Sequence, residues 1–163
     1  MPQVKANGIM LEYESFGPED RETVLLIMGL GAQLTMWPVE LCDELVARGY
    51  RVIRFDNRDV GLSTKFDDAG MPDMTEIFGA LMAGKPATSA YSLDDMAADA
   101  VGLLDALGIG QAHIAGASMG GMIAQLVATN HPEHTLSLTS IMSTTGNSEL
   151  PQGKPEAMAV LMT

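Results

Sequence analysis

The sequence is poor in cysteine: Cys42 is the only one among 163 residues. A lone cysteine forms no disulfide framework and no cysteine metal site, so a disulfide-stabilised secreted fold and a zinc finger are excluded, and we expect a cytoplasmic location. The first five residues lack the basic start and apolar stretch of a signal peptide, and no apolar run is as long as a membrane span. We therefore expect neither a signal peptide nor a membrane partner.

Basic residues are also scarce. The chain has 9 lysines and arginines against 21 aspartates and glutamates, and the resulting net charge of −12 argues against nucleic acid as a partner. Apolar residues make up 47% and charged residues 18% of the chain, which is typical of a globular α/β protein and not of a disordered one. We expect a substantial core of one domain.

Apolar runs typical of strands alternate with runs of helical periodicity. Residues 23–28 are continuously apolar after Thr23, as in a strand buried on both faces, and 51–55 form the next strand. Strands that alternate with helices predict a mostly parallel sheet with helices on both faces, so the fold class is α/β. The other predicted strands cover 3–6, 9–16 (an edge or antiparallel strand), 112–115 and 136–142, and the predicted helices cover 38–48, 92–107 and a segment that ends at Asn130.

Two of these helices carry further sequence signals. The helix over 92–107 is expected to begin with Ser92 as its N-cap and with Asp95 in the capping-box position. The helix over 38–48 is expected to bury one apolar face, formed by Leu41, Leu45 and Val46.

The most informative stretch is Gly116-Ala117-Ser118-Met119-Gly120, which follows an apolar run and opens a helix-like run. A strand, G-x-S-x-G and a helix form the context of a nucleophile elbow, a sharp turn that crowds the residues two before and two after its serine. Ser118 would then stand exposed in a strained conformation, and the amide of Met119 would be a donor to a developing oxyanion. The alternative is a glycine-rich turn whose serine merely caps the helix.

Two further loops are predicted at the same edge of the sheet, because the carboxyl ends of parallel strands lie together. These loops are 28–31 and 56–63. In the second loop, three residues are expected to form a local ion-pair and turn network at a pocket rim: Asp56, Arg58 and Asp59. The alternative is a direct catalytic role for these residues.

Trp37 and the first loop each admit an alternative. Trp37 is either a pocket wall beside the loop or a core aromatic at a helix start. The segment 29–34 after a strand, with Asp56 at the end of the next strand, resembles a dinucleotide-binding fingerprint. Leu34 stands where the third glycine belongs and Pro38 delays the helix that should receive the pyrophosphate, so this alternative is disfavoured.

Taken in chain order, Met28-Gly29-Leu30, the D-x-R-x-x-G-x-S segment 56–63 and the elbow 116–120 resemble the α/β-hydrolase superfamily of serine esterases. Met28 stands where many members have histidine, and Asp59 where they have glycine. Both departures resemble the aclacinomycin methylesterase-like branch, in which a small ester is cut from a bulky, apolar polyketide.

This resemblance implies a serine hydrolase of carboxylic esters that acts through an acyl-enzyme. Ser118 would be the nucleophile, and the backbone amides of Leu30 and Met119 would form the oxyanion hole. The implied substrate is a small-molecule apolar ester, with no cofactor and no metal. The residues expected to contact it are Met28, Gly29 and Trp37, with Met36 beside them.

The activated serine of this mechanism needs a histidine and an orienting acid. The histidines of the chain are His113, His131 and His134. The first lies in the strand that enters the elbow and the others lie beyond the far end of the next helix, so none is expected to reach Ser118. The acid and the histidine are therefore expected in a C-terminal complement outside this chain, for which a separate chain is one alternative.

The resemblance accordingly assigns 1–145 to the N-terminal part of the hydrolase core and 146–163 to a connector and the start of a lid helix. The strand 136–142 would then lie at an open sheet edge. An aspartate-nucleophile dehalogenase or epoxide hydrolase is disfavoured because the elbow carries serine, whereas a perhydrolase side activity stays open. A noncatalytic ligand-binding module, or an inactive fragment of the scaffold, is the alternative of a different class.

Overall fold

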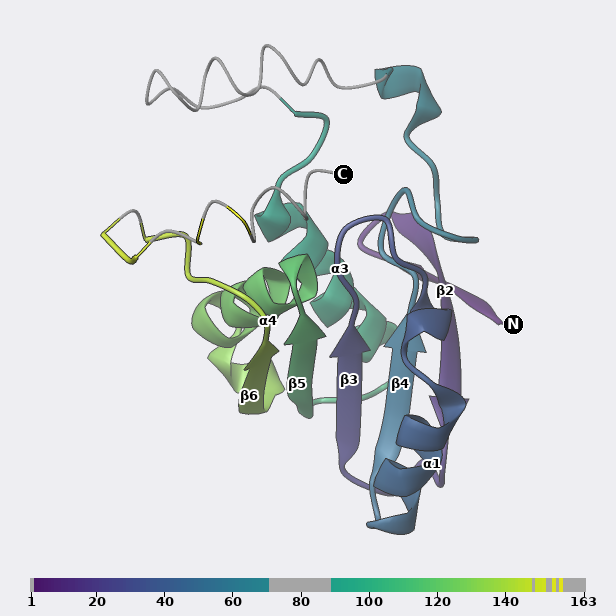
Figure 1. Ribbon diagram of the computed structural model, residues 1–163. Coiled ribbons are helices and arrows are strands. Elements are labelled where there is room, and N and C mark those ends of the chain that lie inside the picture. The colour runs from purple at the N-terminus through teal and green to yellow at the C-terminus, as the bar shows by residue number, and fades with distance from the viewer. Residues whose placement is uncertain (1, 71–88, 148, 152–153, 155, 157–163) are drawn as a thin grey trace.

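The computed structural model describes residues 2–70, 89–147, 149–151, 154 and 156. These residues form a six-stranded sheet in the order β1-β2-β4-β3-β5-β6 (Figure 1). The strands are β1 (Gln3–Ala6), β2 (Ile9–Phe16), β3 (Thr23–Ile27), β4 (Arg51–Phe55), β5 (Ala112–Ala117) and β6 (Thr135–Ile141). The α-helices are α1 (Val39–Ala47), α3 (Leu93–Ala106) and α4 (Met119–Asn130), and short 3-10 turns cover Leu34–Met36, Asp67–Ala69 and Pro132–His134.

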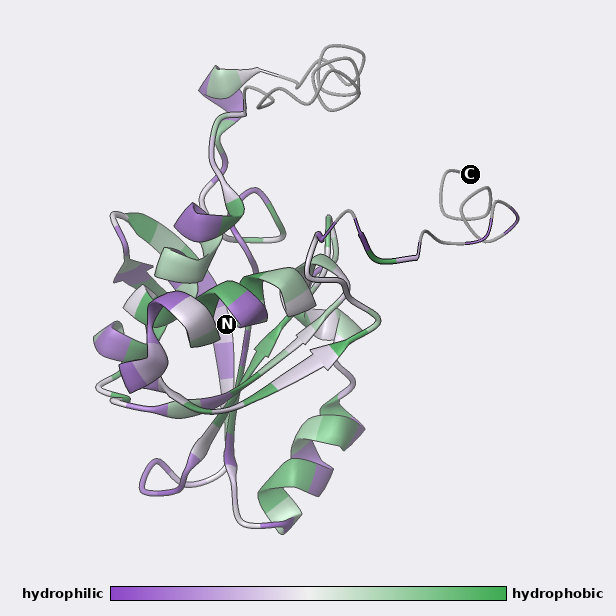
Figure 2. Ribbon diagram, turned by 90° about the vertical axis from the view of Figure 1, so that its left-hand side faces the viewer, coloured by the Kyte–Doolittle hydropathy of each residue, from purple (hydrophilic) through white to green (hydrophobic). Residues whose placement is uncertain are grey.

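Four neighbouring strands, β4, β3, β5 and β6, run parallel, whereas β2 pairs antiparallel with both β1 and β4. Figure 2 shows α1 on one side of the sheet and α3 and α4 on the other. The predicted α/β class, with a mostly parallel sheet and helices on both faces, is therefore confirmed.

The sheet divides the core into two layers because successive side chains of a strand point to opposite faces. In β3, Leu25 and Ile27 pack in the cluster that contains α3 and α4, whereas Val24 and Leu26 pack in the cluster beside α1. All five residues of β3 are buried, as a strand covered on both faces requires.

The buried face of α1 differs from the prediction. Leu41 is 38% exposed, whereas Cys42 is completely buried and Leu45 and Val46 are half-buried. Cys42, Leu45 and Val46 have the i, i+3, i+4 spacing of one helix face, so Leu41, one position away, points off the stripe that contacts β4. Burial also raises the pKa of the Cys42 thiol.

The start of α3 agrees with the prediction. The hydroxyl of Ser92 accepts from the Asp95 amide at 3.1 Å, and the Asp95 carboxylate accepts from the Ser92 amide at 2.7 Å. This reciprocal pair is a complete capping box.

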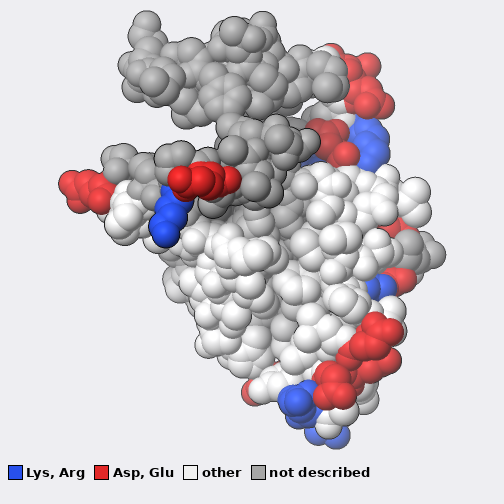
Figure 3. Space-filling view, in the orientation of Figure 1, with Lys and Arg blue, Asp and Glu red and all other residues white. Residues whose placement is uncertain are grey.

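Strand β6 lies at the end of the described sheet, next to β5. Three of its apolar side chains are between 40% and 43% exposed: Leu136, Leu138 and Ile141. On the face shown in Figure 3 the area over β5 and β6 is largely uncharged, whereas charged side chains gather over α1. The predicted lid helix falls, apart from Glu156, outside the described residues.

Within the described part of the chain, no helix combines the length and the apolar character that crossing a membrane needs.

Candidate active site

Ser118 occupies the turn between β5 and α4, at the carboxyl edge of the sheet. Its φ of 54° and ψ of −124° lie outside the regions that a non-glycine residue ordinarily adopts. Its amide donates to the Ile141 carbonyl of β6 at 2.9 Å, and its carbonyl accepts from the Gly121 amide at 2.9 Å. The side chain is exposed and makes no capping hydrogen bond to α4, so the interpretation of Ser118 as a mere helix cap is wrong.

Both glycines of the motif are required by the tightness of this turn. A Cβ on Gly116 would lie 2.0 Å from the Gly120 carbonyl oxygen, and a Cβ on Gly120 would lie 2.2 Å from the Ile27 carbonyl oxygen. These are backbone atoms of α4 and β3, which no side-chain rotation can move. The predicted strained elbow is therefore present.

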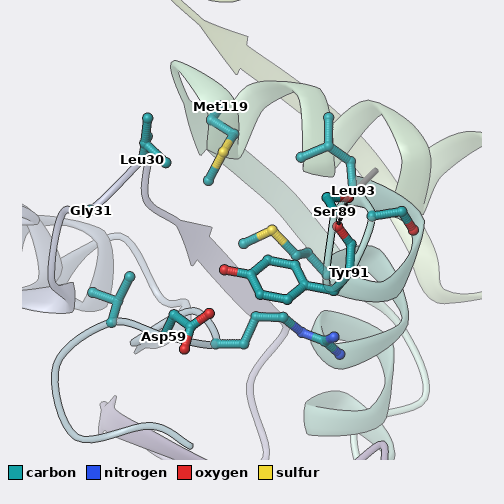
Figure 4. A pocket seen from close by; sticks show the side chains of 11 residues that line it. Leu30, Gly31, Asp59, Ser89, Tyr91, Leu93 and Met119 are labelled. Atoms are coloured by element: carbon teal, nitrogen blue, oxygen red, sulfur yellow. Dashed lines mark hydrogen bonds between the residues drawn. The ribbon is translucent and has the colours of Figure 1, made fainter. Parts of the chain in front are cut away.

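The loop after β3 runs directly against the serine. A Cβ on Gly29 would lie 3.1 Å from Ser118 Cβ and 3.5 Å from its Oγ. The next residue, Leu30, lies beside Met119 at one end of a cavity of about 330 Å³ (Figure 4). The structure thus brings together Ser118 and the two residues whose amides were predicted as oxyanion donors.

The cavity has an apolar and a polar wall. The polar wall contains Arg58, Asp59 and Tyr91. Burial, followed by the nearby Asp59 carboxylate, raises the pKa of Tyr91 to about 12. The Asp59 carboxylate accepts from the Phe66 amide at 2.6 Å, and Asp59 has a φ of 64°, a left-handed conformation that aspartate tolerates better than most residues. The apolar wall is formed by Leu30, Val60, Leu93, Met96 and Met119.

The predicted ion pair within the 56–63 loop is wrong. Arg58 pairs with Asp99 of α3, which holds the pKa of Arg58 above its usual value. Asp56 binds backbone amides instead, from Leu34 at 2.7 Å and Leu62 at 3.0 Å. Asp99 was not among the predicted residues, although the sequence carries one signal: it is a carboxylate on the apolar face of a helix.

Among the predicted substrate contacts, Met28, Gly29 and Trp37 do not line this cavity. Trp37 is 7% exposed and packs in the core with Cys42 and Val52, so its position favours the core alternative. Met36 is 64% exposed.

The three histidines lie where the sequence analysis placed them. His113 bonds Ser137 at 2.8 Å, near the amino end of β5. His131 and His134 follow the last residue of α4, whose 12 residues rise about 1.5 Å each, or roughly 18 Å in all, from the elbow.

Comparison with known proteins places these motifs in context. Residues 22–160 match the model of the alpha/beta hydrolase fold. The chain is 34% identical over 139 residues to the rhodomycin D methylesterase of Streptomyces sp. strain C5, a match that covers 85% of this chain and 41% of that protein. It is 30% identical over 128 residues to 3-oxoadipate enol-lactonase 2 of Acinetobacter baylyi, covering 78% of this chain and 39% of that protein.

Among solved structures, a thermophilic esterase from Thermogutta terrifontis superposes with a TM-score of 0.66 at 27% identity, covering 98% of this chain and 50% of that one. The chain spans about two fifths of the length of the curated relatives named above, 41% and 39%.

Proposed function

Because the chain belongs to the alpha/beta hydrolase fold family, we propose that it carries the nucleophile and oxyanion hole of a carboxylic-ester hydrolase. The observation that carries this proposal is the exposed Ser118 side chain, held at φ 54° on the strand-to-helix turn with the Gly29 backbone against it. The Ser118 side chain makes no capping hydrogen bond that would explain its strained backbone. Strained residues of this kind cluster at active sites.

In the proposed reaction, Ser118 Oγ attacks the ester carbonyl and gives its proton to a general base. The carbonyl oxygen becomes an oxyanion, which the amides of Leu30 and Met119 stabilise with hydrogen bonds. Collapse of this tetrahedral intermediate breaks the ester C–O bond, and the leaving alcohol takes the proton back from the base. Water then attacks the acyl-Ser118 ester in the same way and releases the acid.

The substrate we propose is a neutral ester with an apolar body. The cavity beside Leu30 and Met119 is lined largely by aliphatic and thioether side chains, and the cation at its polar wall, Arg58, is already paired with Asp99. Met28 and Gly29 remain proposed contacts of the ester group itself, since Gly29 approaches Ser118. The relatives named as a methylesterase and an enol-lactonase both cleave ester-type bonds, which supports this class.

We propose that the histidine and its acid come from polypeptide outside these 163 residues. Two observations support this: the positions of the three histidines of the chain, and the two-fifths coverage of the relatives. The same observations favour the second candidate, a binding module that holds apolar esters without hydrolysing them.

A chemical-rescue experiment tests the proposal on the chain itself. The protein is incubated with p-nitrophenyl acetate and increasing imidazole, which supplies a general base in solution, and acetylated peptides are identified by mass spectrometry. We expect acetylation of Ser118 at a rate that rises with imidazole concentration. Ser118→Ala should remove it, whereas Ser140→Ala, which changes an exposed serine of β6, should not.

Two results would contradict the proposal. Acetylation that persists at the wild-type rate in Ser118→Ala would mean that the wrong nucleophile was named. Binding of 2-naphthyl acetate without any acetylation of Ser118 would favour the binding module.

A further inference from the structure

We propose that Asn57 and Asp56, at the carboxyl end of β4, are positioning residues that fix the oxyanion loop. The oxyanion loop is defined here as residues 28–37, which lie between β3 and α1. The inference rests on the proposed function, because it concerns the loop that carries the Leu30 amide. Neither residue touches the substrate: each acts through the backbone that it holds.

Asn57 fixes the beginning of the loop. Its side-chain amide donates to the Met28 carbonyl at 2.8 Å, and Asn57 is 2% exposed. The same carbonyl oxygen lies close to α4, since a Cβ on Gly120 would lie 2.7 Å from it. This hydrogen bond therefore holds the beginning of the loop beside the elbow.

Asp56 fixes the middle of the loop. One carboxylate oxygen accepts from the Leu34 amide at 2.7 Å, and the other accepts from the Leu62 amide at 3.0 Å. Asp56 is 2% exposed, and a Cβ on Gly61 would lie 1.8 Å from its carboxylate. The carboxylate thus holds the two loops at this edge of the sheet against one another.

Arg54, also on β4, fixes the end of the loop. Its guanidinium donates to the Trp37 carbonyl and pairs with Glu14 at 2.5 Å. Between the anchors at Met28 and Leu34 the loop is bonded to itself, through Ala32 N–H and the Gly29 carbonyl at 3.3 Å, and the Leu30 side chain is 82% exposed. The direction of the Leu30 amide therefore depends on the anchors and not on packing of its own side chain.

Because the direction of the Leu30 amide depends on the anchors, their loss should change the rate of Ser118 acylation. Loss of a whole oxyanion donor lowers an acylation rate by about 10²–10³-fold. Loss of an anchor leaves the donor present but misplaced, so we expect a decrease of about tenfold or more in the rate of Ser118 acylation. Binding of the unreacted ester should stay unchanged, because the oxyanion exists only after attack.

The experiment compares Asn57→Asp and Asp56→Asn with a matched control, Ser63→Ala. Asn57→Asp keeps the shape of the side chain but removes the amide group that donates to the Met28 carbonyl. Asp56→Asn keeps the shape of the side chain but replaces one accepting carboxylate oxygen with an amide nitrogen, which cannot accept. Ser63 is buried on the same loop as Asp56, and its hydroxyl donates to the Asp56 carbonyl at 2.6 Å and accepts from the Glu12 amide at 3.0 Å, both of which lie outside residues 28–37. Its variant therefore accounts for loss of stability alone.

Two readouts are taken at conditions where each variant is folded. The first is kinetic: the imidazole-dependent rate of Ser118 acetylation is compared with the affinity for 2-naphthyl acetate. The affinity is measured in variants that also carry Ser118→Ala, so that no acetylation takes place. The second is hydrogen exchange of residues 29–33, which needs no activity. We expect slower acetylation at unchanged affinity, and at least tenfold faster exchange, in both variants but not in Ser63→Ala.

Wild-type-like acetylation in both variants, while wild type itself reacts at Ser118, would overturn the inference and leave the proposed function intact. If wild type does not react at all, the proposed function fails, and exchange alone decides the anchoring. The inference would then be overturned if hydrogen exchange of residues 29–33 in Asn57→Asp and Asp56→Asn is no faster than in Ser63→Ala.

Discussion

Arg58 and Asp99 are 41 residues apart in the chain and are joined by two hydrogen bonds, one of 2.6 Å from Nε to Oδ2 and one of 2.8 Å from Nη2 to Oδ1. Arg58 belongs to the loop after β4, and Asp99 belongs to α3. Their side chains are 6% and 2% exposed, and the rings of Phe66 and Tyr91 lie over the guanidinium at 5.2 Å and 5.1 Å. The pair joins one wall of the cavity to the helix beside it.

Removing one partner of this pair should be strongly destabilising. Asp99→Ala leaves the Arg58 charge buried without its carboxylate partner, and we expect the free energy of unfolding to fall by about 3–5 kcal/mol. Urea unfolding followed by circular dichroism measures the change. Asp105→Ala, on the same helix but 63% exposed at its side chain and 3.9 Å from His134, should change stability by less than about 1 kcal/mol.

A double variant separates the charge from the packing at this site. Arg58→Met with Asp99→Leu removes both charges, so it should recover most of the stability lost in Asp99→Ala. If the double variant is as unstable as Asp99→Ala, the cost lies in packing and the uncompensated charge is not its cause.

The crowding at the elbow predicts that replacement of two different glycines by alanine has very different effects on stability. Gly116→Ala should lower the free energy of unfolding by about 3 kcal/mol or more, because its Cβ would overlap the Gly120 carbonyl oxygen at 2.0 Å. Gly110→Ala, where a Cβ meets nothing within 4 Å and φ is not positive, should be neutral. Thermal unfolding of the two variants checks this, and equal melting temperatures would mean that the elbow can relax around the extra carbon.

The elbow was predictable because its cause is local. Only glycine fits the crowded positions on either side of Ser118, so the G-x-S-x-G spacing is written directly in the chain. The strands were predictable for a similar reason, since a run such as 23–28 is apolar on both faces and must be covered by helices on both. In each case the information lies within a few consecutive residues.

Long-range pairs were not predictable in this way. Nothing near Arg58 indicates that its partner is Asp99, because that contact depends on how α3 packs beside the loop after β4. Asp56 similarly binds amides of two loops, a role that its neighbours do not reveal. Leu41 and Cys42 show the same limit, since a shift of one position in the contact of α1 with the sheet decides which of them is buried.

The capping box of α3 predicts a stability effect that depends on pH. Ser92→Ala should lower the free energy of unfolding by about 1 kcal/mol near neutral pH. Hydrogen bonds from the Ser92 amide and hydroxyl lower the pKa of Asp95 below its ordinary value of 3.8. The contribution of the carboxylate is therefore full above that value and is lost as the pH falls through the lower pKa of the folded protein.

Asp95→Asn measures this contribution. The variant should be less stable than wild type in urea unfolding at pH 7, and the difference should shrink below pH 3.8. Asp94→Asn, one residue away in the same first turn, is the control because its carboxylate is not the one that bonds Ser92. A difference between wild type and Asp95→Asn that is constant down to the lowest pH would contradict the capping role.

The raised pKa of Tyr91, at the polar wall of the cavity, predicts a pH dependence of stability opposite to that of Asp95. Its folded pKa of about 12 lies above the ordinary 10.0 because the phenol is buried beside the Asp59 carboxylate, so the neutral phenol contributes stability to the folded state. This contribution is full below pH 10 and is lost as the pH rises through about 12. Ultraviolet titration of phenolate absorbance should therefore show a component with a midpoint near pH 12 that is absent from Tyr91→Phe and present in Tyr50→Phe. Persistence of that component in Tyr91→Phe would mean that another tyrosine produces it, and would contradict a neutral Tyr91 buried beside Asp59.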